Sequence, residues 1–278
     1  MKIKGDSIFS TSFGGIGGGL GFNNIIADDA VVGGLMPPIT DNLSYFLNPD
    51  EDVYSDAGST LAVNDDAVYQ VNDQSSNSYI FAESVASNQL TYKVDGLGAG
   101  NNSLYKDSQP EWLDFNTSLE YDNTTSFTIH SVFKRLATDT TINVIGRYNS
   151  PSSGRGRVYE YWNGVIYIQD MDGGQLTTTA VTQSTNTTFM SYVIDRVADE
   201  VKIYKNGSLE STTPFSSILY ETTPNEFNNF IFERLFNHNP GESTMTGHFG
   251  YQLGYAEAHS SSQITDMWNW VNTKYGIV

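Results

Sequence analysis

Cysteine is absent from this 278-residue chain, and no run of apolar residues approaches the roughly 18 that a membrane-spanning helix needs. Without thiols, the chain cannot form a disulfide scaffold or a thiolate metal site. Charged residues are also few, at 17% against about 25% in an average globular domain. These absences exclude a disulfide-rich domain, a cysteine-ligated metal protein and a protein anchored by an apolar membrane helix.

Basic residues are especially scarce: 14 Lys and Arg face 32 Asp and Glu, for a net charge of −18. Such a chain repels a phosphate backbone, so nucleic acid is not an expected partner. No base lies between Gly5 and Tyr92. The bases gather instead in one later segment, at Lys134, Arg135, Arg147, Arg155 and Arg157. This distribution indicates either two ordinary solvated surfaces or complementary patches between copies of the chain, and the second interpretation predicts a homo-oligomer.

Uncharged polar and aromatic residues replace the missing charges. Serine, threonine and asparagine together account for 79 residues, and aromatic residues make up 13% of the chain. Aromatic and β-branched residues favour strands, whereas Asn, Ser and Gly favour turns. A chain of this length and aromatic content can bury a large core, which argues against disorder. The composition therefore predicts a folded all-β domain.

Residues 1–38 do not have the pattern of a compact domain. The segment FGGIGGGLG at Phe13–Gly21 holds six glycines in nine residues. A nucleotide-binding glycine loop would need a strand before it and a helix after it, and neither is predicted. Residues 1–38 are therefore either a flexible tail or an arm that orders when it docks on a partner, and we favour the arm. The apolar anchors of this arm would be Phe9, Phe13, Ile16, Leu20, Phe22, Ile25 and Ile26.

From residue 39 onward the pattern changes to short strands separated by turn signals. In Ser126–Phe133 apolar residues occupy both faces, as expected of a strand inside a sandwich. Asn163-Gly164 and Asn206-Gly207 each stand between two strand-like runs, and Asn-Gly accepts the positive φ of a type I′ hairpin turn. Ten or more such strands predict a two-sheet antiparallel jelly-roll β-sandwich over residues 39–278.

The last segment has helical rather than strand periodicity. A helix is predicted over residues 262–275, with Ser262 as its N-cap and Gly276 as its C-cap. Its apolar face would consist of Ile264, Met267, Trp268, Val271 and Tyr275. Trp270 falls outside this face, so it is expected to meet solvent or a neighbouring molecule.

Several segments resemble, in the same order, the concanavalin A-like lectin/glucanase modules of the laminin-G-like type. They are ASNQLTYK, SFTIHSVFK, DEVKIYKNGSLE and the closing ITDMWNWVNTKYGI. A further match is Tyr69–Asp73, where Val71 stands at the position of the family's usual tryptophan. The resemblance covers residues 39–278 and implies a jelly-roll sandwich.

Versions of this module with a glycine-rich N-terminal lead are similar to virion structural proteins of tailed bacteriophages. The resemblance implies a capsid decoration, head-fibre or tail-associated protein on the virion surface. Its arm would contact other virion proteins, and its sandwich would bind host-surface glycans. The alternative is an extracellular carbohydrate-binding or glycan-hydrolysing module of a bacterium. That alternative predicts a signal peptide, and the initial MKIKGDSIFS is not followed by an apolar segment.

Catalytic residues of the glucanase type are not evident. Glucanases of this fold carry an E-x-D-x-x-E pattern on one strand, which supplies a nucleophile and a general acid. Only Glu120-x-Asp122 begins this pattern here, and Thr125 occupies the third position. The four histidines are scattered, without an HExxH motif. We therefore expect a protein that is not an enzyme.

Two further candidate sites rest on local clusters. Asp170 and Asp172 could supply oxygen ligands to Ca²⁺ from a tight loop, although a plain turn after Ile168 is the favoured interpretation. Sugar binding by this fold uses loop aromatic residues for stacking and polar residues for hydroxyl groups. The richest such cluster is Tyr148, Arg155, Arg157, Tyr159, Tyr161, Trp162 and Asn163. Its alternative interpretation is a mixture of core and ordinary surface residues.

Overall fold

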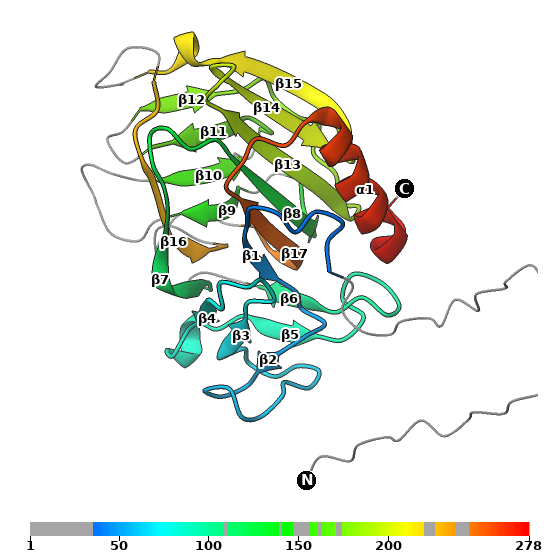
Figure 1. The fold of residues 1–278 in the computed structure, drawn as a ribbon. Helices are drawn as coiled ribbons and strands as arrows, with labels where there is room; N and C mark the ends of the chain where they lie inside the picture. The colour runs from blue at the N-terminus through cyan, green and yellow to red at the C-terminus, as the bar shows by residue number, and fades with distance from the viewer. Residues whose placement is uncertain are drawn as a thin grey trace, which may run out of the picture. The chain divides into compact units, whose positions relative to one another are not determined.

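A computed structural model describes residues 36–107, 111–138, 141–146, 156–160, 163–170, 174–219, 226–236 and 245–277. The predicted arm anchors, from Phe9 to Ile26, lie outside these residues. Within them the chain forms two antiparallel sheets and one C-terminal helix (Figure 1). This confirms the predicted all-β two-sheet sandwich.

One sheet has eight strands. Its order is β15-β14-β13-β8-β17-β6-β5, and β1 also pairs with β17. The strands are β1 (Leu43–Leu47), β5 (Thr91–Lys93), β6 (Ser103–Lys106), β8 (Phe127–Arg135), β13 (Thr188–Asp195), β14 (Glu200–Lys205), β15 (Ser208–Pro214) and β17 (Gly247–Tyr255). Every residue of the central strand β8 except Lys134 is buried, because the sandwich core covers one face and the C-terminal helix part of the other.

The second sheet has nine strands, in the order β12-β11-β10-β9-β16-β7-β4-β3-β2. They are β2 (Val53–Tyr54), β3 (Gln70–Asn72), β4 (Ile80–Ala82), β7 (Leu113–Tyr121), β9 (Ile142–Gly146), β10 (Arg157–Glu160), β11 (Ile166–Gln169), β12 (Gln175–Thr177) and β16 (Phe230–Leu235). Short 3₁₀ turns, η1 (Ala86–Asn88) and η2 (Phe215–Ser217), lie in the connections. Val71, where the modules that the sequence resembles usually have tryptophan, is a core residue of β3.

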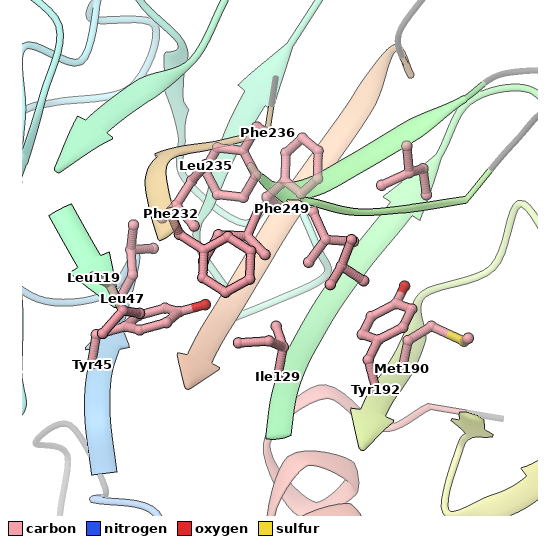
Figure 2. Close-up of a cluster of buried hydrophobic side chains, with 14 of the residues drawn as sticks. Tyr45, Leu47, Leu119, Ile129, Met190, Tyr192, Phe232, Leu235, Phe236 and Phe249 are labelled. Atoms are coloured by element: carbon pink, nitrogen blue, oxygen red, sulfur yellow. The ribbon is translucent and has the colours of Figure 1, made fainter. Parts of the chain in front are cut away.

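The core fills the space between the two sheets. Figure 2 shows Ile129 and Tyr192 of the eight-stranded sheet facing Leu119 and Phe232 of the nine-stranded sheet. All four side chains are buried. Aromatic rings dominate: Phe127 stacks on Tyr121 with a centroid distance of 4.5 Å and meets Phe232 edge to face. The aromatic-rich composition is therefore used mainly to fill this layer.

The predicted type I′ Asn-Gly turn is present at Asn206-Gly207, whereas at Asn163-Gly164 the strands pair but the connection is longer, because Glu160 pairs with Ile166 and, of these two turn residues, only Gly164 has positive φ. Asn206 and Gly207 join β14 to β15 with φ values of 49° and 77°, the positive values that a type I′ turn requires. Gly207 is also required sterically, because a Cβ there would lie 2.7 Å from the indole ring of Trp268. β10 and β11 pair as predicted around Asn163-Gly164, and Gly164 has φ of 81°.

The predicted C-terminal helix is α1 (Ser261–Tyr275), and its N-cap is Ser260 rather than Ser262. Ser260 forms a capping box with Gln263, which satisfies two backbone N–H groups that Ser262 could not reach. Gly276 is the left-handed C-cap, as predicted. In the part of the chain that the structure describes, no helix has the length and apolar character needed to cross a bilayer.

The position of Trp270 differs from the prediction. Its ring stacks on Tyr251 at 4.9 Å and meets Phe46 edge to face at 5.9 Å. Trp268 is only half-buried, beside Phe189. Both flanks of α1 therefore contact the eight-stranded sheet, because its contact surface extends from β13 to β1 and is wider than the predicted helix stripe (Figure 1).

The basic segment is also less exposed than its sequence suggests. Arg135 is buried in an ion pair with Glu160, with an N–O distance of 2.6 Å. Arg157 is buried and donates from Nε to the side-chain oxygen of Gln169 at 2.8 Å. The prediction of a basic surface is therefore wrong for these two residues, while homo-oligomer formation stays a prediction.

Candidate functional site

A row of paired residues crosses the outer face of the nine-stranded sheet. The register pairs Gln169 with Arg157, Arg157 with Gly146, Gly146 with Arg234, and Arg234 with Asp114. Directly opposite residues of a ladder point to the same face. The neighbouring row, which points the other way, consists of the core residues Ile168, Val158, Ile145, Leu235 and Leu113. The polar row therefore lies on the face opposite the core.

A β-bulge in β7 interrupts this face. Leu119 pairs with Phe232 and Asp114 pairs with Arg234, so residues 115–118 of β7 stand opposite the single residue Glu233 of β16. These residues cannot all pair with β16, although Phe115 still pairs with Phe81 of β4, and the unpaired part of the strand bends outward. Asn116, Thr117 and Ser118 are accordingly exposed, whereas Phe115 remains in the core.

Arg234 and Asp114 form a rigid polar pair beside the bulge. Arg234 donates from Nε and Nη2 to the two carboxylate oxygens of Asp114, at 2.6 and 3.0 Å. The guanidinium carbon lies 3.8 Å from the ring centroid of Trp112. Arg234 is only 3% exposed, whereas the Asp114 side chain is 42% exposed. The pair thus presents a held carboxylate to solvent, and the fork and the ring fix its geometry.

An open groove of about 440 Å³ lies over this pair. Its lining consists of Asp114, Phe115, Asn116, Thr117, Ser118, Glu233 and Arg234. Asn116 accepts a hydrogen bond from the backbone N–H of Ile80 at 3.1 Å, which fixes its amide and directs its NH₂ group away from that bond. Together with two exposed hydroxyl groups, these side chains offer a dense set of donors and acceptors to a hydroxyl-rich ligand.

The predicted sugar cluster is only partly described. Tyr148, Arg155, Tyr161, Trp162 and the side chain of Tyr159 lie outside the described residues. Arg157 is on the same face as the groove, two strands from Arg234. Asn163 is exposed in its turn, where its side chain accepts from the N–H of Val165 at 3.1 Å. The cluster therefore stays a prediction, with Arg157 on the same sheet face as the groove but outside its lining.

Sequence reasoning missed Asp114 and Arg234, which are 120 positions apart. Both have aromatic neighbours, Trp112 and Phe115 for Asp114 and Phe232 and Phe236 for Arg234, but these short runs read as core strands and match no binding motif. The β-bulge is also invisible in the sequence, because it depends on how β7 is paired. The weak signal that existed was the polar run Asn116-Thr117-Ser118 inside an otherwise alternating strand.

The candidate calcium loop is closed by backbone contacts. Asp170 is fully buried, and its carboxylate accepts from the N–H groups of Gly174 and Asn228, each at 2.7 Å. Asp172 lies outside the described residues. Within the described ranges, His, Asp and Glu side chains do not gather in a group of three that could hold a metal. Calcium binding by Asp170 and Asp172 therefore stays a prediction.

The carboxylates that begin the glucanase pattern have structural contacts. Asp122 accepts from the backbone and hydroxyl groups of Thr124 and Thr125 at 2.7–2.9 Å, which closes a turn and lowers the pKa of its carboxyl group. Glu120 accepts from the side-chain amide of Asn229 at 3.0 Å. Asp122 thus acts as a turn residue.

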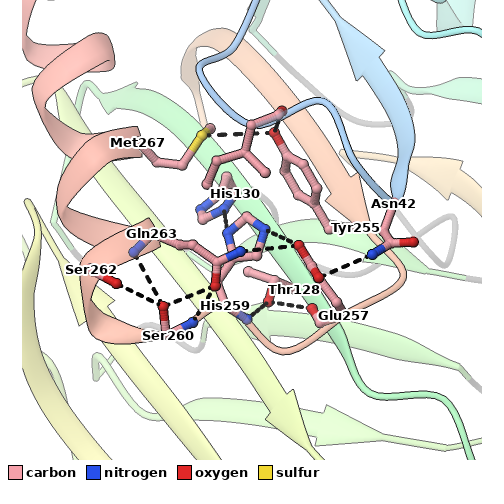
Figure 3. Close-up of polar contacts among 11 residues, drawn as sticks. Asn42, Thr128, His130, Tyr255, Glu257, His259, Ser260, Ser262, Gln263 and Met267 are labelled. Carbon is pink, nitrogen blue, oxygen red and sulfur yellow. Dashed lines mark hydrogen bonds and ion pairs between the residues drawn. The ribbon is translucent and has the colours of Figure 1, made fainter.

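Two buried histidines meet beneath α1 (Figure 3). His130 Nε2 lies 3.0 Å from His259 Nδ1, and His130 Nδ1 lies 2.8 Å from the hydroxyl of Ser191. His259 Nε2 is 3.5 Å from a carboxylate oxygen of Glu257. This order of groups is that of a proton relay, but Ser191 and His130 are fully buried, and no described groove reaches them. The sequence suggested isolated histidines, and only the fold brings these two together.

No protein-family model matches the chain, and no curated protein matches it. Several solved structures are similar to the chain. The binding domain of Paraclostridial mosquitocidal protein 1 aligns with a TM-score of 0.57 at 11% identity, over 83% of this chain and 52% of that one. The botulinum neurotoxin serotype D binding domain aligns with a TM-score of 0.50 at 13% identity, over 84% and 52%. The serotype G binding domain gives 0.50 at 12%, over 73% and 48%.

The chain therefore spans about half the length of these solved structures. At such low identity the likeness concerns the fold. It places the described domain among β-sandwich domains of the kind found in toxin binding domains, in agreement with the lectin-like sandwich expected from the sequence.

Proposed function

We propose that the described sandwich is a non-enzymatic glycan-recognition module that binds its sugar in the groove between β7 and β16. The observation that carries this proposal is the Arg234–Asp114 pair at the groove floor, held by a bidentate fork and the Trp112 ring. The similar solved structures are named as binding domains, which supports a recognition role. The glucanase pattern requires a carboxylate at its third position, and this chain has Thr125 there, which supports a role without glycosidase activity.

The binding mode follows from the groove's hydrogen-bonding groups. Each Asp114 oxygen accepts one bond from Arg234 and retains acceptor capacity, so two neighbouring sugar hydroxyls can donate to it. The Asn116 amide and the hydroxyls of Thr117 and Ser118 can complete the hydrogen bonds of the same ring. Because Arg234 and Asn116 are already held in place, little conformational entropy is lost when the sugar binds.

The charge of the groove predicts its specificity. Among the described lining residues, Asp114 and Glu233 are acidic, and the cation Arg234 is already bound to Asp114. A sugar carboxylate would therefore meet net negative charge and be repelled. We expect a glycan array to show binding to neutral oligosaccharides and weaker binding to sialylated or uronic-acid analogues. A preference for the acidic analogues would contradict this charge argument.

Substitution of exposed groove residues tests the groove as the binding site, because these side chains are not part of the core. The double variant Asn116→Ala/Ser118→Ala is expected to weaken glycan binding about 10-fold or more, since each lost hydrogen bond contributes about 1 kcal/mol. Isothermal titration with the best glycan from the array measures this. The matched control is Thr212→Ala, an exposed strand residue of the other sheet. Equal affinities of the double variant and wild type would rule out this groove.

For the biological setting, we propose a bacteriophage virion surface. Residues 1–38 would anchor the protein to capsid or tail proteins, and the sandwich would be displayed outward as a decoration or fibre to contact host glycans. The sequence resemblance and the glycine-rich arm support this setting. A bacterial extracellular module is the alternative, because a glycan-binding sandwich serves both equally well. Co-purification with virus particles that is lost on deletion of residues 1–36 would favour the virion; a soluble monomer in bacterial culture medium would favour the alternative.

A further inference from the structure

Helix α1 is joined to the eight-stranded sheet across the His130–His259 pair (Figure 3). His130 belongs to β8, and His259 lies in the connection between β17 and α1. At 0% and 2% exposure, both imidazoles are enclosed. Around them α1 covers apolar side chains of the sheet, which are Val132, Phe189, Tyr251, Leu253 and Tyr255.

The hydrogen bonds of the pair allow only a limited number of protons. The 3.0 Å contact between His130 Nε2 and His259 Nδ1 requires one protonated nitrogen and one lone pair. If both rings were fully protonated, two N–H groups would face each other at this distance. The rings would also carry like charges, with centroids 5.0 Å apart, in a site without water access. The closed interface is therefore compatible with neutral imidazoles.

The groups around the pair cannot offset two added charges. From β13, the Ser191 hydroxyl and the Phe189 ring contact His130. From β17, the ring of Tyr255 lies 4.3 Å from that of His259, and burial raises the pKa of this phenol, so it stays neutral. From β8, the hydroxyl of Thr128 accepts from the backbone N–H of His259.

Glu257 is the one carboxylate that faces the pair among the described contacts. It lies 3.5 Å from His259 Nε2 and already accepts from Gln263 of α1 and from Asn42. The side chains that α1 itself contributes here, Gln263 and Met267, are uncharged. At most one proton on the pair is therefore balanced by a counter-charge.

We propose that the His130–His259 pair is an acid-sensitive latch, which releases α1 from the sheet when both histidines become protonated. Release would uncover the apolar face beneath the helix while the sandwich core, which lies on the other side of the sheet, stays folded. The device is independent of the glycan groove, which is on the outer face of the other sheet.

The pH range in which α1 is held on the sheet follows from the direction in which the two histidine pKa values are shifted. Burial lowers the pKa of His259 to about 4, and burial together with His259 lowers that of His130 well below its usual range. In the released state both would titrate near the ordinary value of about 6.5. A depressed folded-state pKa means that the latch is fully effective above about pH 6.5 and is lost as the pH falls through about 4.

Hydrogen–deuterium exchange of the full chain at pH 7 and at pH 4, corrected for intrinsic rates, tests the latch. Amides of residues 261–275 are expected to exchange at least about 10-fold faster at pH 4, while those of the core strands β7 and β16 change little. The variant His259→Asn keeps an acceptor near the Nδ1 position and cannot gain a proton. It should remove most of the acid effect. The control His248→Asn removes a histidine of the same sheet that contacts Ser103 and Tyr105, and it should retain the effect.

Two results would overturn the proposal. One is unchanged exchange of residues 261–275 between pH 7 and pH 4. The other is simultaneous opening of the helix and of both sheets, which would make the histidines ordinary core residues. NMR titration of the wild-type imidazoles needs no variant: titration of both near pH 6.5 in the folded protein would also contradict the latch, and titration near pH 4 coincident with helix exchange would support it.

Discussion

Glu160→Ala is expected to lower the free energy of unfolding by about 3–5 kcal/mol, because it breaks a buried ion pair and leaves a buried charge behind. Glu160 Oε1 lies 2.6 Å from Arg135 Nη2, and both side chains are only 2% exposed. Removing the carboxylate deprives the Arg135 guanidinium of its counter-charge inside the protein. Chemical denaturation at pH 7 measures the loss.

Two controls separate the charge effect from packing. Glu200 forms a comparable pair with Lys202 at 2.6 Å, but both side chains are about one quarter exposed, so Glu200→Ala should cost less than about 1 kcal/mol. Replacing both buried partners, as Arg135→Met with Glu160→Leu, should recover most of the stability lost by Glu160→Ala. Equal destabilisation by Glu160→Ala and Glu200→Ala would show that burial of the pair is unimportant.

Asp114→Ala is expected to weaken glycan binding about 10- to 100-fold, the largest effect of any single substitution in the groove. The change removes one carboxylate with its two acceptor oxygens, and it also releases Arg234 from the fork that orients it. A hydrogen bond to a charged group contributes about 1.5–3 kcal/mol, which exceeds the contribution of a neutral hydroxyl. Calorimetric titration of the variant with the preferred neutral oligosaccharide measures the loss.

Asp122→Ala is the matched control for this variant. Asp122 is an aspartate just beyond the same strand, but it closes a turn with Thr124 and Thr125 and is not in the groove lining. It should leave affinity unchanged. Wild-type affinity in Asp114→Ala, or an equal loss in both variants, would show that the Arg234–Asp114 pair does not bind the sugar.

The parts of the fold that could be predicted are those encoded by neighbouring residues. The Asn206-Gly207 hairpin depends on two backbone angles that these residues adopt readily. The strand periodicity of Phe127–Arg135 and the helical periodicity before Gly276 likewise depend on a few consecutive positions. The two-residue error in the N-cap is equally local, because Ser260 and Ser262 are both serines and only Ser260 is positioned to form the capping box with Gln263.

The candidate site could not be predicted, because it depends on contacts between distant segments. Asp114 meets Arg234 only through the pairing of β7 with β16, and the bulge that raises Asn116 above the sheet exists only in that pairing. His130 and His259 are 129 positions apart and are likewise brought together by the sheet and the helix connection. Pattern reasoning instead selected Arg157 from a local aromatic cluster, and the sheet register then placed it two strands from Arg234.

The few charged residues of this chain show which properties the sequence determines and which the tertiary structure decides. The sequence alone determined that the chain is an acidic, thiol-free, aromatic-rich all-β protein with a terminal helix, because composition and short-range periodicity decide these properties. Only the tertiary structure decided which of its few bases are internal: Arg135 pairs with Glu160, and Arg234 pairs with Asp114. The physical reason is that a charge can be buried only where a partner compensates its desolvation, and that partner comes from a distant strand.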